Sequence, residues 1–222
     1  MADELKSVPL TAALHDYLVD HGTPPDLPLQ RLIERTNDLG EISRMQVAPE
    51  QGAFLTLLTA TLGTRRAVEV GTFTGYSSTC IARGLAPGGR LLCCDVSEEW
   101  TAIARDAWTD AGVDDAIELR LAPALDTLKG LPDAEPIDLA FIDADKGGYL
   151  GYLHALLDGG LLAPDGLICV DNTLLQAEPY LDREPSANGA AIAEFNRAVA
   201  ADPRVEQVMV PLRDGLTLII RT

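Results

Sequence analysis

Positive charge is scarce in this sequence. The 222 residues include 17 lysines and arginines against 34 aspartates and glutamates, which gives a formal net charge of −17 at pH 7. The sequence has no run of basic residues, whereas binding to nucleic acid or to an anionic membrane depends on clustered lysine and arginine. The composition therefore argues against nucleic-acid and membrane partners and indicates a well-solvated surface.

Long apolar runs are also absent. No stretch approaches the ~18 uninterrupted apolar residues of a membrane span. Residues 1–4, Met-Ala-Asp-Glu, are acidic rather than apolar. We therefore expect no membrane-spanning helix, no signal peptide and a cytoplasmic location.

Cysteine and histidine are few, with four and three residues respectively. All four cysteines lie in apolar runs, which favours reduced core cysteines. Cys93 and Cys94 are adjacent in a predicted strand, so their side chains point to opposite faces and cannot bind one metal together. No histidine lies near a predicted strand end, which argues against a zinc site.

Several catalytic motifs are missing. The sequence contains no Gly-x-Ser-x-Gly elbow, no P-loop and no Cys-x-x-Cys, so hydrolase and NTPase functions have no support. Gly71 and Gly75 are spaced differently from the dinucleotide fingerprint, since Thr72 or Phe73 stands where the middle glycine would admit a pyrophosphate. A nicotinamide-dependent oxidoreductase is therefore a weaker alternative.

The sequence does contain a strand, a glycine-bearing turn and a helix start in residues 66–78. The apolar run 67–70 is followed by Gly71 and Gly75, and Tyr76 begins a helical pattern. This is the first unit of an open α/β sheet, and the turn suits a nucleoside-like ligand without a diphosphate. Asp95 ends the next strand, where an acid can bind a ribose, so the pattern suggests S-adenosylmethionine.

The rest of the chain repeats the strand–helix alternation. We expect a Rossmann-like α/β fold with a seven-stranded, mostly parallel sheet, helices on both faces and a C-terminal antiparallel hairpin. The predicted strands are residues 67–70, 90–95, 117–121, 137–142, 167–170, 205–210 and 216–220. The predicted helices are 10–20, 29–39, 49–62, 76–85, 97–111 and 191–201, with a short helix after Pro123 and another that ends at 157. Pro49 suits the first turn of its helix, and Ser97 with the two glutamates after it suits a capped helix start. The other predicted segments are a connector at 41–48, a turn at 164–166 and a long loop at 173–190. We expect a single domain over 1–222, with an N-terminal helical extension (1–62) and a Rossmann-like core (63–222).

Acidic and amide side chains follow several predicted strands. Asp143, Asp171 and Asn172 follow strands expected to be neighbours, and ligands of open α/β sheets bind at the carboxyl ends of strands. Three such oxygen ligands suit a hard cation such as Mg²⁺, although the acids could instead cap helices or bind loop N–H groups. Lys146 lies one turn beyond Asp143; beside a dication it could act as a base, and otherwise it is an exposed lysine at a helix start. Glu69, in a buried strand, needs a partner, which a ligand could supply.

Five stretches of the sequence together resemble a known family. They are 45–55 (MQVAPEQGAFL), 68–77 (VEVGTFTGYS), 141–149 (FIDADKGGY), 170–173 (VDNT) and 214–217 (DGLT). From about Ser43 onward the chain resembles the cation-dependent small-molecule O-methyltransferases. These are the caffeoyl-CoA O-methyltransferase-like enzymes and, more distantly, catechol O-methyltransferase.

The resemblance implies a role for each matching residue. Asp143, Asp171 and Asn172 would bind Mg²⁺ or another divalent cation such as Mn²⁺ or Ca²⁺, and Lys146, with Asp143, would be catalytic. The positions implied to contact S-adenosylmethionine are Glu69, Gly71, Thr72, Ser77, Asp95, Ala122, Asp143 and Asp145. Those implied to contact the substrate are Met45, Tyr152 and Leu175. The resemblance also implies a homodimer.

Three positions depart from the pattern of the plant enzymes. Leu175 replaces a tryptophan, Val47 replaces a threonine, and Gly147 and Gly148 replace a polar pair. The catalytic set is therefore kept while the set that recognises the substrate differs. We expect methyl transfer from S-adenosylmethionine to a hydroxyl of a catechol-like small molecule, with a non-catalytic S-adenosylmethionine-binding protein as the alternative from another class.

Overall fold

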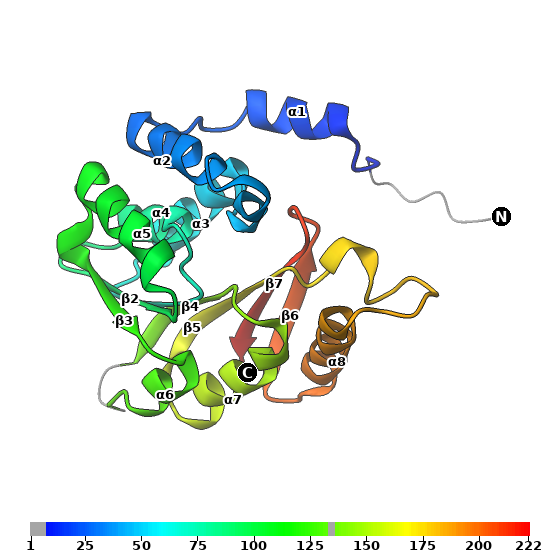
Figure 1. Cartoon of the computed structure of the whole chain (residues 1–222). Helices are drawn as coiled ribbons and strands as arrows, with labels where there is room; N and C mark the ends of the chain where they lie inside the picture. Colours follow the sequence, from blue (N-terminus) through cyan, green and yellow to red (C-terminus); the bar gives the residue numbers. More distant parts are fainter. Residues whose placement is uncertain (1–7, 133–135) are drawn as a thin grey trace.

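The computed structural model describes residues 8–132 and 136–222. It contains a seven-stranded sheet of order β3-β2-β1-β4-β5-β7-β6 (Figure 1). β1 to β5 pair in parallel, whereas β7 is antiparallel to both β5 and β6. The predicted α/β fold, with its closing hairpin, is confirmed. Residues 1–4, considered above for a signal peptide, lie outside the described residues.

The boundaries of the elements are close to those predicted. The strands are β1 (Arg66–Val70), β2 (Arg90–Asp95), β3 (Ile117–Leu121), β4 (Ile137–Ile142), β5 (Leu162–Asp171), β6 (Val205–Val210) and β7 (Leu216–Arg221). The α-helices are α1 (Ala12–Asp20), α2 (Leu27–Asn37), α3 (Pro49–Thr61), α4 (Tyr76–Gly84), α5 (Glu98–Ala111), α6 (Ala124–Lys129), α7 (Tyr149–Asp158) and α8 (Ala187–Ala201). No helix among these described residues is both long and apolar enough to cross a lipid bilayer.

Helices cover both faces of the sheet and create two cores. Val68 and Val70 of β1 point into the core beneath α6, α7 and α8, whereas Ala67 points into the core beneath α2 to α5 (Figure 1). Cys93 and Cys94 fall into different cores, as the alternation of side chains along a strand requires. All four cysteines are buried and free.

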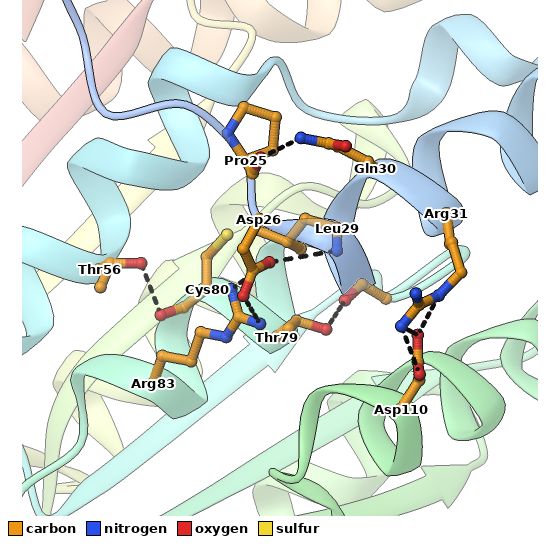
Figure 2. Close-up of polar contacts among 11 residues, drawn as sticks. Pro25, Asp26, Leu29, Gln30, Arg31, Thr56, Thr79, Cys80, Arg83 and Asp110 are labelled. Carbon is orange, nitrogen blue, oxygen red and sulfur yellow. Dashed lines mark hydrogen bonds and ion pairs between the residues drawn. The ribbon is translucent and has the colours of Figure 1, made fainter.

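Polar contacts fasten α2 to the sheet-covering helices (Figure 2). Arg31 forms two hydrogen bonds with Asp110 of α5, at 2.8 and 2.7 Å. Asp26 caps α2 by accepting from Leu29 N and also pairs with Arg83 of α4 at 2.8 Å. The two anchors hold α2 against helices that lie far from it in sequence. In contrast, no residue of α1 is buried.

Two local predictions were wrong, and a third segment is more regular than predicted. The turn predicted at 164–166 lies inside β5, where the pairing with β4 shifts register between Ile137 and Leu139. α8 begins at Ala187 rather than 191, because Ser186 Oγ caps it by accepting from Gly189 N at 3.1 Å. The connector predicted at 41–48 contains a 3₁₀-helix, Gly40–Met45.

Candidate active site

The glycine turn after β1 is shaped by neighbouring protein atoms. Gly71 has a φ of 90°, and a Cβ at this position would collide with the backbone carbonyl of Asp143. Glycine therefore allows the loops after β1 and β4 to pack together, in addition to any approach of a ligand. Asp95 holds the same turn, because its Oδ2 accepts from Thr72 N and Phe73 N, both at 2.9 Å.

A single cavity of about 1020 Å³ opens where β1, β2, β4 and β5 end. It brings together thirteen of the fourteen predicted site residues: Met45, Gly71, Thr72, Ser77, Asp95, Ala122, Asp143, Asp145, Lys146, Tyr152, Asp171, Asn172 and Leu175. Glu69 does not line it. Its side chain is fully buried beneath the cavity wall, near Thr72 and Ser77.

Lys146 lies at the centre of the candidate catalytic group. Its Nζ donates to Asp143 Oδ1 at 3.0 Å, to Asn172 Oδ1 at 2.6 Å and to the Tyr149 hydroxyl at 2.7 Å. Tyr149 is itself fully buried, and its hydroxyl donates to the backbone carbonyl of Asp171 at 3.1 Å. The three donors of the ammonium are thus all used, and Lys146 is partly buried rather than the exposed lysine of the alternative interpretation.

The chemistry of this group fits a hard cation. Asp143, Asp171 and Asn172 place two carboxylates and one amide oxygen near one another, and the Lys146 ammonium already bridges two of the three side chains. Burial, and then the negative charge of Asp143, raise the pKa of Asp171 to about 7. In residues 8–132 and 136–222 no group of three His, Cys, Asp or Glu side chains could hold a metal. A site here would therefore depend on the amide of Asn172, whose φ of 57° lies in a region that asparagine tolerates.

Glu69 lies in a strongly desolvated position. Burial raises its pKa to about 8, although the side chains of Ser77, Thr72 and Cys93 oppose the shift by facing the carboxylate. Within the described residues neither carboxylate oxygen has a hydrogen bond of good geometry. Glu69 is thus a buried carboxylate that needs a partner, as the sequence predicted.

The three predicted substrate contacts come from different elements around the cavity. The Tyr152 hydroxyl donates to Asp145 Oδ1 at 2.6 Å, which ties it to a residue predicted to contact the cofactor. Leu175 follows the candidate metal ligands along the chain, and Met45 ends the 3₁₀-helix before α3. We call the region lined by Met45, Leu175 and Lys146 the acceptor end of the cavity.

Several lining or supporting residues were not predicted. Tyr149 closes the motif at 141–149, so its spacing from Lys146 was a usable signal. Phe73 and Trp100 form an edge-to-face pair in the cavity wall, with ring centroids 5.1 Å apart. Arg44 and Arg213 also line the cavity, and nothing in their local sequence distinguishes them from surface arginines.

The sheet order and the position of the cavity define a Rossmann-like α/β enzyme with its ligand site at the carboxyl ends of the strands. A family model described as O-methyltransferase matches residues 22–222. The chain therefore belongs to the O-methyltransferase family, and its reaction class is S-adenosylmethionine-dependent O-methyl transfer.

Individual relatives agree with this assignment. "Probable caffeoyl-CoA O-methyltransferase 1" of Dictyostelium discoideum is 36% identical over 212 residues, which cover 93% of this chain and 90% of the relative. The O-methyltransferase from Bacillus cereus, solved in complex with SAH, is 31% identical with a TM-score of 0.85, covering 95% and 97% of the two chains. The SAH-bound methyltransferase PaMTH1 of Podospora anserina is 26% identical with a TM-score of 0.87, covering 97% and 98%. The predicted resemblance to caffeoyl-CoA O-methyltransferase-like enzymes is confirmed.

Proposed function

We propose that this enzyme transfers a methyl group from S-adenosylmethionine to one hydroxyl of a catechol-like small molecule, with the help of a divalent cation. The observation that carries the proposal is the position of Lys146 Nζ, which lies within hydrogen-bond distance of both Asp143 Oδ1 and Asn172 Oδ1. The residue proposed as the base is therefore in direct contact with two of the proposed cation ligands.

Asp143, Asp171 and Asn172 would hold the cation. When bound, Mg²⁺, or Mn²⁺ or Ca²⁺ in its place, would supply a Lewis acid that favours the ionised hydroxyl at neutral pH. Engagement of the two side-chain oxygens that now accept from Lys146 would free the amine from those bonds. Tyr149, which contacts the same Nζ at 2.7 Å, would then keep Lys146 in place.

The residues of the chain would perform the transfer mainly by positioning. Lys146, as a neutral amine, accepts the proton of the acceptor hydroxyl. The resulting oxygen forms a bond to the methyl carbon while the carbon–sulfur bond breaks, and the sulfur keeps the bonding electron pair. The leaving product is SAH, which is the compound present in the related B. cereus structure. The cofactor end, with Ser77, Asp95, Ala122 and Asp145 in its wall, would align the methyl group with that oxygen.

The proposal also covers the assembly, location and partners of the protein. We propose a cytoplasmic homodimer whose partners are small molecules rather than nucleic acid or membrane. The net charge of −17 supports the exclusion of polyanions, and the exposed apolar side chains of α1 support self-association.

The decisive experiment is methyl transfer from labelled S-adenosylmethionine to a panel of catechols, with Mg²⁺ and with excess chelator. We expect labelled product that disappears with chelator and returns when Mg²⁺ is added back. Transfer that persists in chelator would contradict the role of the cation. Confirmed cofactor binding without transfer to any catechol would favour the non-catalytic alternative or a different acceptor. In a separate assay with an added nicotinamide cofactor, a change in its absorbance would favour an oxidoreductase.

A further inference from the structure

The acceptor end of the cavity includes an arginine in an uncommon backbone conformation. Arg213 lies in the turn between β6 and β7 and lines the cavity. Its φ of 51° is in the left-handed region, which glycine adopts freely and a residue with a Cβ adopts at a cost. Backbone strain in the wall of a binding cavity motivates the hypothesis that the side chain has a role there.

The turn is fastened to the segment after β5, which contains Leu175 of the acceptor end. The backbone carbonyl of Asp214 accepts from Leu174 N at 2.8 Å and from Leu175 N at 3.2 Å. The carboxylate of Asp214 accepts from Gln176 N at 2.6 Å. Arg213 is therefore held beside the segment that directly follows the candidate cation ligands.

The guanidinium of Arg213 has donors to spare. Within the described residues it donates no hydrogen bond, and its ion pair there joins Nε to Glu50 Oε1 at 3.7 Å, which is too long for a hydrogen bond. Glu50 also faces His15 Nδ1 at 3.4 Å, so its carboxylate is not dedicated to Arg213. With a side chain that is 47% exposed, Arg213 presents a planar set of donors to a ligand.

A second arginine lines the same cavity. Arg44 contributes one hydrogen bond among the described residues, from Nε to the carbonyl of Glu41 at 3.4 Å. The lining also contains five aspartates, so the two guanidinium groups would act on an anion as local hydrogen-bond donors and not through a net positive potential.

We propose that Arg213, assisted by Arg44, binds a carboxylate on the acceptor, so that the preferred acceptors are catechols that carry a carboxylic acid. The guanidinium fork matches the two oxygens of a carboxylate and can bind them through parallel hydrogen bonds. This inference rests on the proposed function, because it requires the diol of the same molecule to lie at Lys146. Beyond the proposed function, the inference specifies the charge of the acceptor and its orientation in the cavity.

The test compares 3,4-dihydroxycinnamate with its methyl ester, which differ in charge but not in the diol, and adds the coenzyme A thioester as a phosphate-bearing acceptor. We expect the wild-type enzyme to prefer the free acid. Arg213→Gly should lower kcat/KM for the acid roughly 10- to 100-fold, mainly through KM, as expected for a lost charged hydrogen-bond partner. The ester should change by less than about twofold by the same reasoning.

Glycine suits this substitution because it adopts the left-handed backbone without strain, and unchanged activity on the ester would show that the turn still folds. Arg105→Ala is the matched control, since it removes the same charge from an exposed site of α5 that does not line the cavity. It should leave both acceptors unaffected.

Other outcomes would overturn the inference. An equal loss of kcat/KM for acid and ester, or no preference for the acid in the wild type, would contradict the carboxylate subsite. Neither outcome would contradict catechol methylation. A preference for the thioester that Arg213→Gly abolishes would assign the arginines to phosphate instead. Failure to methylate any of the three acceptors would contradict the proposed function itself.

Discussion

At the scale of single residues, Lys146 carries the strongest prediction. Lys146→Ala should reduce methyl transfer by about 10²- to 10⁴-fold, the usual contribution of a positioned general base. Binding of S-adenosylmethionine, measured by calorimetry, should change little, because Lys146 contacts Asp143, Asn172 and Tyr149, of which only Asp143 is also predicted to contact the cofactor.

Two further variants separate chemistry from charge. Lys146→Arg keeps a cation but cannot act as a base at neutral pH, so it should be as inactive as the alanine variant. Lys129→Ala removes an exposed lysine of α6 and should retain full activity. Unchanged turnover in Lys146→Ala would show that another group takes the proton.

The burial of Glu69 leads to a prediction about how the stability of the protein depends on pH. Its pKa is raised from 4.5 to about 8 by burial, so between these values the folded ligand-free chain holds a proton that the unfolded chain releases. The protonated Glu69 therefore adds to the free energy of unfolding below about pH 4.5. This stabilisation is lost as pH rises through 8, with a slope of at most about 1.4 kcal/mol per pH unit. Asp171, with a pKa of about 7, acts in the same direction.

Glu69→Gln should consequently flatten, but not abolish, the fall in melting temperature of the ligand-free protein between pH 5 and pH 8. Glu206→Gln, an exposed change on β6, is the control and should follow the wild type. Identical slopes for all three proteins would mean that Glu69 is ionised in the folded chain.

The sequence alone supported most of the site at this scale but not its supporting contacts. Asp143, Lys146 and Asn172 could be placed together because each follows a strand end and parallel strands end at one edge. Arg213 could not be found in this way, since its position depends on how a turn far along the chain packs beside Leu175. Similarly, Asp95 was expected to face a ribose, whereas its carboxylate also holds the backbone of the glycine turn.

At the scale of elements, the segment after β5 depends on a contact from the β6–β7 turn. Leu175, Gln176 and Ala177 all have positive φ values, and the Asp214 carboxylate accepts from Gln176 N. Asp214→Ala should loosen this segment, at a cost of about 1 kcal/mol for one lost hydrogen bond. We expect faster amide exchange at 173–177 and a several-fold higher KM for the acceptor, with cofactor affinity unchanged.

Asp214→Asn keeps an oxygen that can accept from Gln176 N and should resemble the wild type. If the alanine variant weakens cofactor and acceptor equally, the segment does not belong to the acceptor end alone. If amide exchange at 173–177 does not change, the carboxylate does not hold the segment.

Element boundaries could be predicted wherever a local signal decided them. Ser97 before two glutamates set the start of α5, and Pro49 set the start of α3. The turn predicted at 164–166 instead lies at an irregularity inside β5, between the pairs Ile137–Leu162 and Leu139–Leu167. A strand that continues past such an irregularity depends on its pairing on both sides, which a short window of sequence does not show.

At the scale of the whole molecule, the fold places the candidate site at one edge of the sheet. The order β2-β1-β4-β5 sets the ends of four parallel strands side by side, and their loops supply both the cofactor end and the acceptor end. The alternation of strands and helices was sufficient to predict this arrangement. It could not predict how the N-terminal helices lie, because their contacts join residues that are far apart in the sequence. Leu32 of α2 and Leu55 of α3 pack in the same core as Ala67 of β1, and Arg31 pairs with Asp110 of α5.

The position of α1 leads to the last prediction, which concerns assembly. No residue of α1 is buried, yet Tyr17 and Leu18 are apolar and 58% and 49% exposed. An amphipathic helix with its apolar side chains in water is stabilised by burying them against another surface. If a second copy of the chain supplies that surface, light scattering should give twice the chain mass for the wild type. Leu18→Asp should then shift the protein toward the monomer.

Val208→Asp provides the matched comparison, because Val208 is similarly exposed, at 53%, but lies on the edge strand β6. It should remain dimeric if α1 forms the interface. Dissociation by Val208→Asp, with no effect of Leu18→Asp, would place the interface at the edge of the sheet. A wild type that is monomeric at every concentration would contradict the dimer, and the exposure of α1 would then need another partner.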